Sequence, residues 1–168
     1  MMKNIKTAAK NKAEGYLALF SYGDKNEWQA SMNGYVAAEL MWNADLSETA
    51  LRNEYIEGYY GNSSKYVKKL IAAFEAHYEL LKDNSDFRFK MTKDDDIGFN
   101  VRFYPEKLLT EAIAVMDEAI AELDKNSADY DIMVKRLKCV RLTPMRMLHY
   151  NYYAYYPRDK KGYYALGE

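Results

Sequence analysis

Apolar residues recur at helical spacing along most of this chain. Trp28, Met32, Val36 and Leu40 follow one another at intervals of four residues and form one apolar stripe, which predicts a helix over residues 27–43. Tyr35 and Trp42 are expected to widen this stripe. The same periodicity predicts further helices over residues 45–60, 64–83, 105–123 and 127–152. We therefore expect a mainly α fold, an antiparallel helix bundle of about five helices.

Turn and capping residues mark where the earlier helices should begin and end. Asp45 with Glu48 three residues later matches a capping box, in which each side chain bonds the other residue's backbone N–H. Gly61 is placed as a left-handed stop at a C-terminal end. Asn62 or Ser63 is then expected to cap the helix that follows.

Two prolines and a serine shape the later helices. Pro105 suits the first position of a helix, because its missing N–H would have no partner there. Ser127 is expected to cap the last helix. Pro144 falls inside that helix, removes one backbone donor and should kink it. Gly34 also lies inside a helix, where it should cost about 1 kcal/mol relative to Ala, and a close helix neighbour is one reason for a glycine there.

Two stretches depart from the helical pattern. Between residues 87 and 103, apolar and polar residues alternate on both sides of a polar turn, which predicts a short β-hairpin-like excursion. The run Gly15–Ser21 is apolar, but its periodicity does not separate a strand from a buried helix. At 168 residues we expect a single domain over residues 1–168, with a loosely attached tail at 157–168.

Tyrosine is the outlier in the composition. There are 17 tyrosines, and many of them crowd into a few short stretches: Tyr59, Tyr60, Tyr150, Tyr152, Tyr153, Tyr155, Tyr156, Tyr163 and Tyr164. A ring with a polar tip suits packing near a wet surface, which we favour, and also suits stacking on sugars. The net charge is −1 with the two signs mixed, so no cluster of Lys and Arg indicates nucleic-acid binding.

No targeting or membrane segment is recognised. The apolar runs fall short of the ~20 residues that a membrane helix needs. The N-terminal stretch is basic and lacks a sustained apolar region, so we identify no signal peptide. Localisation is left open; for a secreted or periplasmic parent protein, this chain would begin downstream of the signal. The single cysteine, Cys139, excludes an internal disulfide.

The chain shows no catalytic or metal-binding pattern, so we expect no catalytic residues, no metal and no cofactor. Three aspartates at 94–96 suggest calcium, but the sixth and twelfth positions counted from Asp94 are not the Gly and Glu of an EF-hand. His77 and His149 belong to no zinc or di-iron spacing. Carboxylates paired at i,i+3 or i,i+4 are typical of solvated helix faces.

The segment Gly34–Gly61 resembles a bacterial family of uncharacterised proteins related to glycoside hydrolases, near the α-glucuronidases. In that family a barrel helix leads to a Leu-x-Trp-Asn-Pro-Asp turn, and the next helix ends in Tyr-Tyr-Gly. Here the turn reads Leu40-Met41-Trp42-Asn43-Ala44-Asp45, with Ala44 in place of the proline, and Tyr59-Tyr60-Gly61 matches the stop. The last helices are also similar to the family's C-terminal helical region, so the resemblance covers about residues 15–155.

The resemblance implies that this chain is the C-terminal portion of a larger protein, with residues 1–26 as a remnant of a preceding barrel. The apolar run before Tyr22 would be the last barrel strand, and the loop after it would help to build an active site. On that basis Tyr22, Asp24, Glu27 and Trp28 are candidate sugar contacts, with Trp28 stacking on the ring and the carboxylates binding hydroxyls. The alternative for Trp28 is that it anchors the apolar stripe of its helix, and we favour that alternative.

Three functions are carried forward. The first is a non-catalytic C-terminal helical module of a glycoside-hydrolase-like protein, which supports a barrel domain or a protein contact. The second is a carbohydrate-binding module that uses Trp28 and the clustered tyrosines. The third, a small stand-alone enzyme, is disfavoured because no acid–base pair or nucleophile converges. The expected partners are a carbohydrate and the upstream barrel domain, with no nucleic acid and no membrane.

Overall fold

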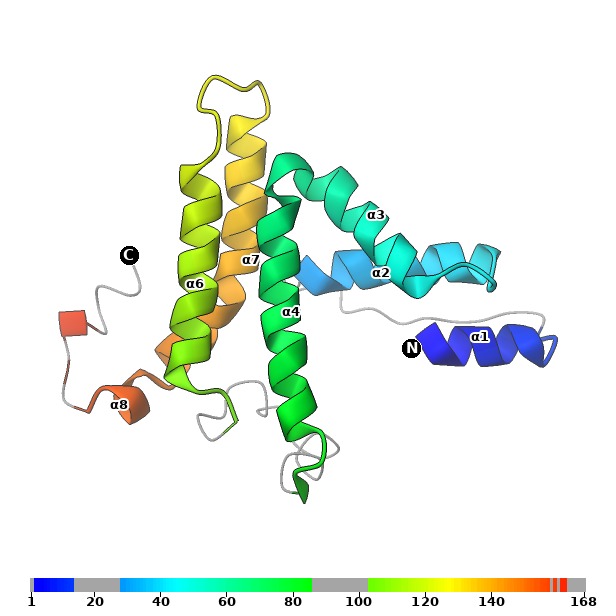
Figure 1. Ribbon diagram of the computed structural model, residues 1–168, viewed down its shortest axis with the longest axis horizontal. Coiled ribbons are helices and arrows are strands. Elements are labelled where there is room, and N and C mark those ends of the chain that lie inside the picture. The colour runs from blue at the N-terminus through cyan, green and yellow to red at the C-terminus, as the bar shows by residue number, and fades with distance from the viewer. Residues whose placement is uncertain (1, 14–27, 86–102, 158, 160, 163–168) are drawn as a thin grey trace. The chain divides into compact units, whose positions relative to one another are not determined.

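The described part of the chain is helical. A computed structural model describes residues 2–13, 28–85, 103–157, 159 and 161–162 (Figure 1). Regular structure in these ranges consists of helices, which confirms the predicted mainly α class. The predicted hairpin at 87–103 falls almost entirely outside the described residues, and so does the run Gly15–Ser21.

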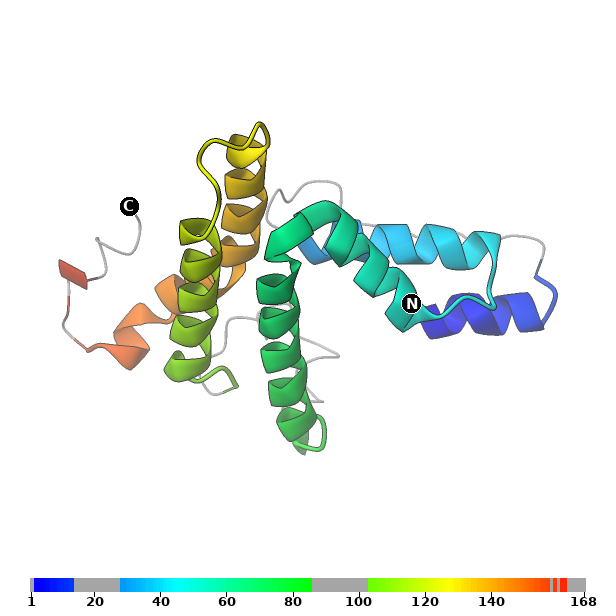
Figure 2. The same cartoon turned by 45° about the horizontal axis from the view of Figure 1, so that its top comes forward.

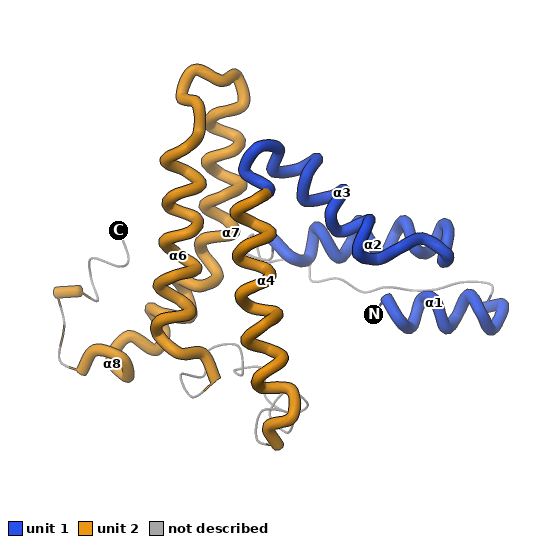
Figure 3. Tube along the Cα trace, viewed as in Figure 1, with its two compact units in different colours: residues 1–64 blue, residues 65–168 orange. Residues whose placement is uncertain are grey.

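Contacts between Cα atoms divide the chain into two compact units. Unit 1 comprises residues 1–64 and unit 2 comprises residues 65–168 (Figure 3). Each unit has its own set of buried residues and is described by itself. The single domain expected from the sequence stays a prediction.

The described residues of unit 1 form three α-helices and one short turn of 3-10 helix. These are α1 (Met2–Lys10), α2 (Trp28–Trp42), α3 (Glu48–Tyr60) and η1 (Gly61–Ser63). The helix α3 folds back against α2, and α1 lies alongside α2 (Figures 1 and 2). One apolar cluster joins all three helices: Met2, Ile5, Val36, Ala37, Leu40 and Leu51.

The first helix, α1, was not predicted from the sequence. Met2 and Ile5 are its only buried residues, and both pack into the cluster of unit 1. Two large apolar residues within a helix of nine residues are too few for periodicity to identify it, because the test needs a window of 11–18 residues. Tertiary packing against α2 therefore supplies what the local pattern lacks.

The predicted apolar stripe of α2 is confirmed. Trp28, Met32, Val36 and Leu40 are all buried, with exposed fractions between 0% and 8%. Trp42 was expected to widen this stripe, and that prediction was wrong. Its side chain is 92% exposed, because a residue two positions past Leu40 points away from the buried stripe at the end of α2.

Where unit 2 is described, its main elements are three long helices and one short one. These are α4 (Ser64–Leu81), α6 (Glu106–Ala121), α7 (Tyr130–Tyr150) and α8 (Tyr152–Tyr155). The helices α4 and α7 run in one direction and α6 runs in the other, which gives the antiparallel arrangement that was predicted (Figures 1 and 2). Leu109 and Ile113 of α6 pack against Met147 and Leu148 of α7, with Phe74 of α4 at the edge of this cluster.

The beginning of α3 differs from the prediction. The N-cap is Ser47, whose Oγ accepts a hydrogen bond from the backbone N–H of Ala50 at 3.3 Å. Asp45 instead donates its own N–H to the side-chain oxygen of Asn43 at 3.0 Å, which makes a local turn before the helix. Ser and Asp are nearly equally favourable as N-caps, so the sequence pattern could not separate Asp45 from Ser47.

The other helix ends follow the sequence signals with small shifts. Gly61 has the predicted positive φ of 50°, but its ψ of −129° lies outside the left-handed helical region because the chain turns at once into η1. That 3-10 turn replaces the predicted Asn62 or Ser63 cap. Pro105 is the N-cap of α6 rather than its first residue.

The last long helix begins later than predicted. Asp129 occupies the N-cap position of α7 without a side-chain cap bond, while the Oγ of Ser127 accepts from the N–H of Asp129 at 3.3 Å. Pro144 lies inside α7 and is buried, and the helix continues past it. Hydrophobic packing against α6 therefore outweighs the lost backbone bond.

Candidate functional site

The most exposed large apolar side chain described is Trp42, at the C-terminal end of α2. It is 92% exposed and its neighbour Met41 is 45% exposed. We call Met41, Trp42 and the loop 43–47 the Trp42 corner. A tryptophan in water is unusual on a folded unit unless something else covers it, so this corner is the first candidate for a contact surface.

Local hydrogen bonds shape the backbone of the Trp42 corner. The N–H of Asn43 donates to the carbonyl of Glu39 at 2.8 Å and so ends α2. The side chain of Asn43 then accepts from the N–H of Asp45, and its carbonyl accepts from the N–H of Leu46 at 3.3 Å. Asparagine is suited to this role because its short amide can bond the backbone two residues later. The Trp-Asn pair therefore marks a helix end with a turn of defined hydrogen bonding.

A ladder of tyrosine rings lies between α2 and α3. The ring of Tyr35 is 5.6 Å from that of Tyr55, and Tyr55 stacks on Tyr59 at 5.3 Å with an interplanar angle of 14°. Tyr59 meets the buried Tyr60 edge to face at 5.0 Å. We call Tyr35, Tyr55 and Tyr59 the tyrosine ladder. Tyr59 is 37% exposed, so the outer end of the ladder reaches solvent.

A carboxylate lies beside the tyrosine ladder. The hydroxyl of Tyr35 donates a hydrogen bond to Oε1 of Glu54 at 2.9 Å. This bond is the largest cause that raises the pKa of Tyr35, because it stabilises the protonated hydroxyl. An aromatic face next to a hydrogen-bonding carboxylate is the combination that binds sugar rings and their hydroxyls.

The helix period places the Trp42 corner and the tyrosine ladder along one edge of α2. Tyr35 and Trp42 are seven residues apart, which brings them to the same side of the helix and about 10 Å apart along its axis. Neither feature supplies an acid, a base or a nucleophile in a closed site. The arrangement is suited to contact and stacking rather than to bond cleavage.

The sequence-predicted site residues are only partly within the described chain. Tyr22, Asp24 and Glu27 lie outside the described residues. Trp28 is 8% exposed and belongs to the buried stripe of α2. Its position agrees with the anchoring role, and its contact with a sugar stays a prediction.

Trp42 was not predicted as a site residue, although its position in the sequence indicates exposure. Leu40 is the last buried residue of the stripe, and a residue two positions further along a helix points about 160° away from it as the turn of α2 ends. A tryptophan directly before a helix-ending asparagine is therefore expected to be exposed. The sequence interpretation gave weight to the stripe and not to this position.

The polar groups of unit 2 form separate pairs that join its segments. The hydroxyl of Tyr155 donates to the carbonyl of Tyr104 at 2.6 Å, and the hydroxyl of Tyr156 donates to the carboxylate of Glu106. The bond to Glu106 raises the pKa of Tyr156 to about 12. These bonds fasten α8 and the residue after it to the start of α6.

A second tyrosine of α8 binds the described part of the tail. The hydroxyl of Tyr152 donates to Oδ2 of Asp159 at 2.8 Å, and the N–H of Gly162 donates to Oδ1 of the same carboxylate at 3.0 Å. Accepting these bonds lowers the pKa of Asp159. Asp159 therefore has defined contacts, although the tail was expected to be loosely attached.

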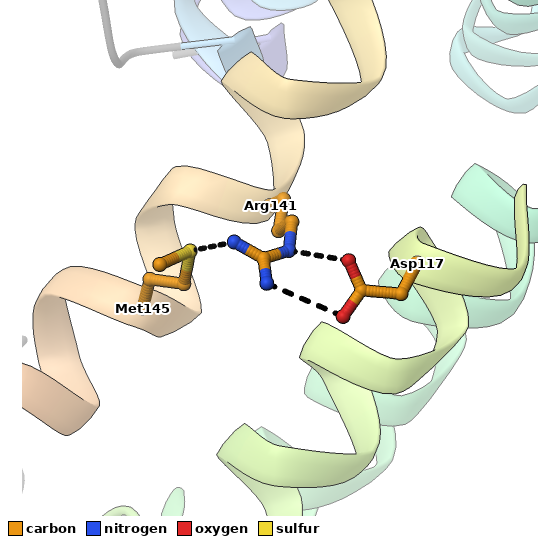
Figure 4. A network of polar contacts seen from close by, with 3 residues as sticks. All are labelled: Asp117, Arg141 and Met145. Atoms are coloured by element: carbon orange, nitrogen blue, oxygen red, sulfur yellow. Dashed lines mark hydrogen bonds and ion pairs between the residues drawn. The ribbon is translucent and has the colours of Figure 1, made fainter. Parts of the chain in front are cut away.

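Two further pairs hold the long helices of unit 2 together. Arg141 of α7 donates from Nε and Nη2 to the carboxylate of Asp117 on α6, and from Nη1 to the sulfur of Met145 (Figure 4). Lys65 of α4 donates to Oε2 of Glu122 after α6 at 2.9 Å. Hydrogen bonds from Tyr66 and Lys65 lower the pKa of Glu122. Each pair therefore connects two segments of unit 2 that are distant in sequence.

No metal site is formed by the part of the chain that the structure describes. Within the described residues, no group of three or more His, Cys, Asp and Glu side chains is placed to hold an ion. The ring Nε2 of His77 donates to the carbonyl of Phe103, which occupies that nitrogen with a structural contact. Of the described helices, none combines the length and hydropathy required to span a bilayer.

Comparison with known proteins matches the part of the chain that carries the Trp42 corner. Residues 1–72 match the family described as a Domain of unknown function (DUF4838). This range covers unit 1 and the start of α4, so both the Trp42 corner and the tyrosine ladder lie inside it. No curated protein and no solved structure matches the chain.

Proposed function

We propose that this chain is a non-catalytic helical module of a glycoside-hydrolase-like protein and that the Trp42 corner contacts the barrel domain of that protein. The observation that carries the proposal is the 92% exposure of Trp42 on the segment that resembles such proteins. Exposed tryptophans are enriched at the anchors of interfaces, because covering them removes a large apolar surface from water. Met41 adjoins it and extends the apolar surface.

The polar groups of the described residues support a non-catalytic role. The carboxylates of Glu106, Asp117 and Glu122 are each engaged by a tyrosine, an arginine or a lysine from a neighbouring segment. A glycosidase needs two carboxyl groups across a cleft, at about 5–10 Å from each other. These three carboxylates instead stabilise contacts between segments of unit 2, and in this proposal the acid and nucleophile of any hydrolase lie in the barrel.

Hydroxyl-radical footprinting with peptide mass spectrometry tests the barrel contact. The oxidation rate of Trp42 is compared between the isolated chain and the longer polypeptide that carries the barrel, with the 67% exposed Tyr150 of unit 2 as an internal reference. We expect several-fold protection of Trp42 relative to Tyr150 in the longer polypeptide. Equal oxidation of Trp42 in both proteins would overturn the proposal. Trp42→Ala should leave the unfolding of the isolated chain unchanged, because Trp42 lies outside the core.

A second candidate is carbohydrate binding, and the tyrosine ladder favours it. The stacked rings of Tyr55 and Tyr59 end at a partly exposed face, and Glu54 lies within reach of Tyr35. Aromatic faces of this kind stack on the apolar faces of sugar rings, and a carboxylate accepts bonds from sugar hydroxyls. In this reading Tyr59 and Trp42 would provide the stacking that was expected of Trp28.

Fluorescence titration separates the two candidates. The variant Trp28→Phe leaves Trp42 as the single tryptophan, and it is titrated with neutral and acidic oligosaccharides. A saturable change that Tyr59→Ala abolishes, while Tyr130→Ala does not, would support carbohydrate binding. A flat response across the panel, together with protection in the footprinting experiment, would support the module alone.

A further inference from the structure

Unit 1 carries a second surface feature, an open groove beside α1. The groove has a volume of about 360 Å³ and is lined by Lys3, Lys6, Thr7, Lys10 and Glu48. Four of these residues come from α1 and one from the first turn of α3. Among them are three cations and one carboxylate, although the chain as a whole has a net charge of −1.

The lysines of the groove form one row. Lys3, Lys6 and Lys10 are spaced three and four residues apart on α1, so their side chains leave the helix on one side and span about 10 Å along its axis. Met2 and Ile5 leave α1 about 100° around the helix axis from this row, and they are buried in the cluster with Val36, Ala37 and Leu40. The apolar side of this basic helix is therefore occupied by its own unit and is not available for insertion into a lipid surface.

Two contacts organise the groove. The ammonium of Lys6 donates to the carbonyl of Leu46 at 2.7 Å, which fixes its position at the wall and leaves two of its three N–H donors for other acceptors. Glu48 faces Arg52 at 3.1 Å, so the one carboxylate of the groove is balanced by a guanidinium outside the lining. The lysines consequently give the groove a net positive field.

We propose that this groove binds a ligand with two or more linked oxyanion groups of the phosphate or sulfate type. The row of ammonium groups matches a series of separate negative charges, because one anionic group can face each end of the row. Lysine acts as a point charge with freely directed donors and is a common ligand of phosphate, so a spaced row of lysines suits linked oxyanion groups. The groove adjoins the Trp42 corner, because Lys6 bonds the carbonyl of Leu46 in the loop 43–47, but this proposal does not rest on the proposed function.

Isothermal titration calorimetry with inorganic tripolyphosphate tests the proposal, and orthophosphate serves as the single-group probe. The variant Lys3→Gln/Lys10→Gln removes the two ends of the row at exposed positions. A matched control, Lys135→Gln/Lys138→Gln, makes the same charge change at exposed positions of α7 in unit 2. We expect saturable binding of tripolyphosphate that weakens about tenfold or more in the groove variant and little in the control.

The same titrations give the results that would overturn the proposal. No saturable binding of tripolyphosphate by the unmodified chain would do so, and so would equal weakening in the two double variants, which would indicate a general charge effect. Orthophosphate bound as tightly as tripolyphosphate would show a single-anion site and would contradict the row. Higher salt should weaken the binding of tripolyphosphate, since the contacts are ionic and exposed.

Discussion

The guanidinium of Arg141 on α7 holds the carboxylate of Asp117 on α6 with two parallel hydrogen bonds, from Nε at 2.6 Å and from Nη2 at 3.3 Å. The Arg141 side chain is 28% exposed and that of Asp117 is 51% exposed. A two-pronged pair of this kind is geometrically specific in a way that a single lysine contact is not. It joins the two helices that pack most extensively within unit 2.

Breaking this pair should lower the free energy of unfolding by a modest amount. We expect Arg141→Lys to cost about 0.5–1 kcal/mol, because lysine keeps the charge but cannot make both bonds at once. A double-mutant cycle with Asp117→Ala, measured by urea denaturation, should give a coupling of the same size. The exposed pair Lys107–Glu111, with N and O 3.8 Å apart, is the control and should give a smaller coupling. Equal couplings in the two cycles would contradict a special role for the two-pronged geometry.

The N-cap of α3 gives a second prediction. Ser47→Ala should lower the free energy of unfolding by about 1 kcal/mol, because the N–H of Ala50 loses its acceptor. Asp45→Ala should have a clearly smaller effect, since its side chain does not cap the helix. Urea denaturation of both variants measures the difference. A larger loss of unfolding free energy in Asp45→Ala than in Ser47→Ala would instead support Asp45 as the N-cap, as the sequence predicted.

The bond between Tyr156 and Glu106 predicts how stability changes at high pH. The pKa of Tyr156 is raised to about 12 in the folded chain, above the value near 10 of an unfolded tyrosine. A raised pKa stabilises the fold fully below pH ~10, and that contribution disappears as the pH rises towards ~12. At neutral pH the Tyr156→Phe variant should therefore have a lower free energy of unfolding than the unmodified chain. Between pH ~10 and ~12 its free energy of unfolding should fall less than that of the unmodified chain.

Unfolding by urea at a series of pH values from ~8 to ~12 measures this effect. Tyr130→Phe provides the control. Tyr130 lies at the start of α7, and the tyrosine that donates to Glu106 is Tyr156. The control should follow the unmodified chain through the alkaline range. A Tyr156→Phe curve parallel to that of the unmodified chain would show that the bond to Glu106 does not matter for folding.

Helical periodicity predicted the architecture where an apolar stripe was long. The stripe from Trp28 to Leu40 and the core face of α6 appear as expected, because burying a continuous face is what stabilises a helix in a folded unit. The helix α1 was not predicted, since only Met2 and Ile5 mark its buried side. Its formation depends on residues of α2 and α3 that are distant in sequence, and no local pattern encodes that contact.

The candidate site was less accessible to sequence reasoning than the fold. From the sequence, Trp42 was assigned to the apolar stripe of its helix, and Trp28 was considered both as a sugar contact and as an anchor of that stripe, with the anchor favoured. The exposure of Trp42 depends on which side of α2 its position faces as the helix ends, and the N-cap of α3 was predicted at Asp45 rather than at Ser47. The lysine row of α1 was missed for the same reason that the helix was missed.

Three glycines of unit 1 provide the last prediction, because all three have open surroundings but only one has a positive φ. A Cβ added at Gly34 or Gly58 meets no described atom within 4 Å, so the close helix neighbour considered for Gly34 is not found among the described residues. Both lie inside helices, where Ala is favoured over Gly by about 1 kcal/mol. Gly34→Ala and Gly58→Ala should each raise the free energy of unfolding by up to about that amount.

Gly61 should respond in the opposite sense. A Cβ there also meets no described atom, but its φ of 50° with ψ of −129° is a backbone conformation that residues with a side chain rarely adopt. Gly61→Ala should therefore lower the free energy of unfolding by about 1–3 kcal/mol. Urea denaturation of the three alanine variants separates backbone strain from packing. A loss of stability in Gly34→Ala would mean that a side chain there meets a neighbour, whereas a neutral Gly61→Ala would mean that this turn adopts another backbone conformation in solution.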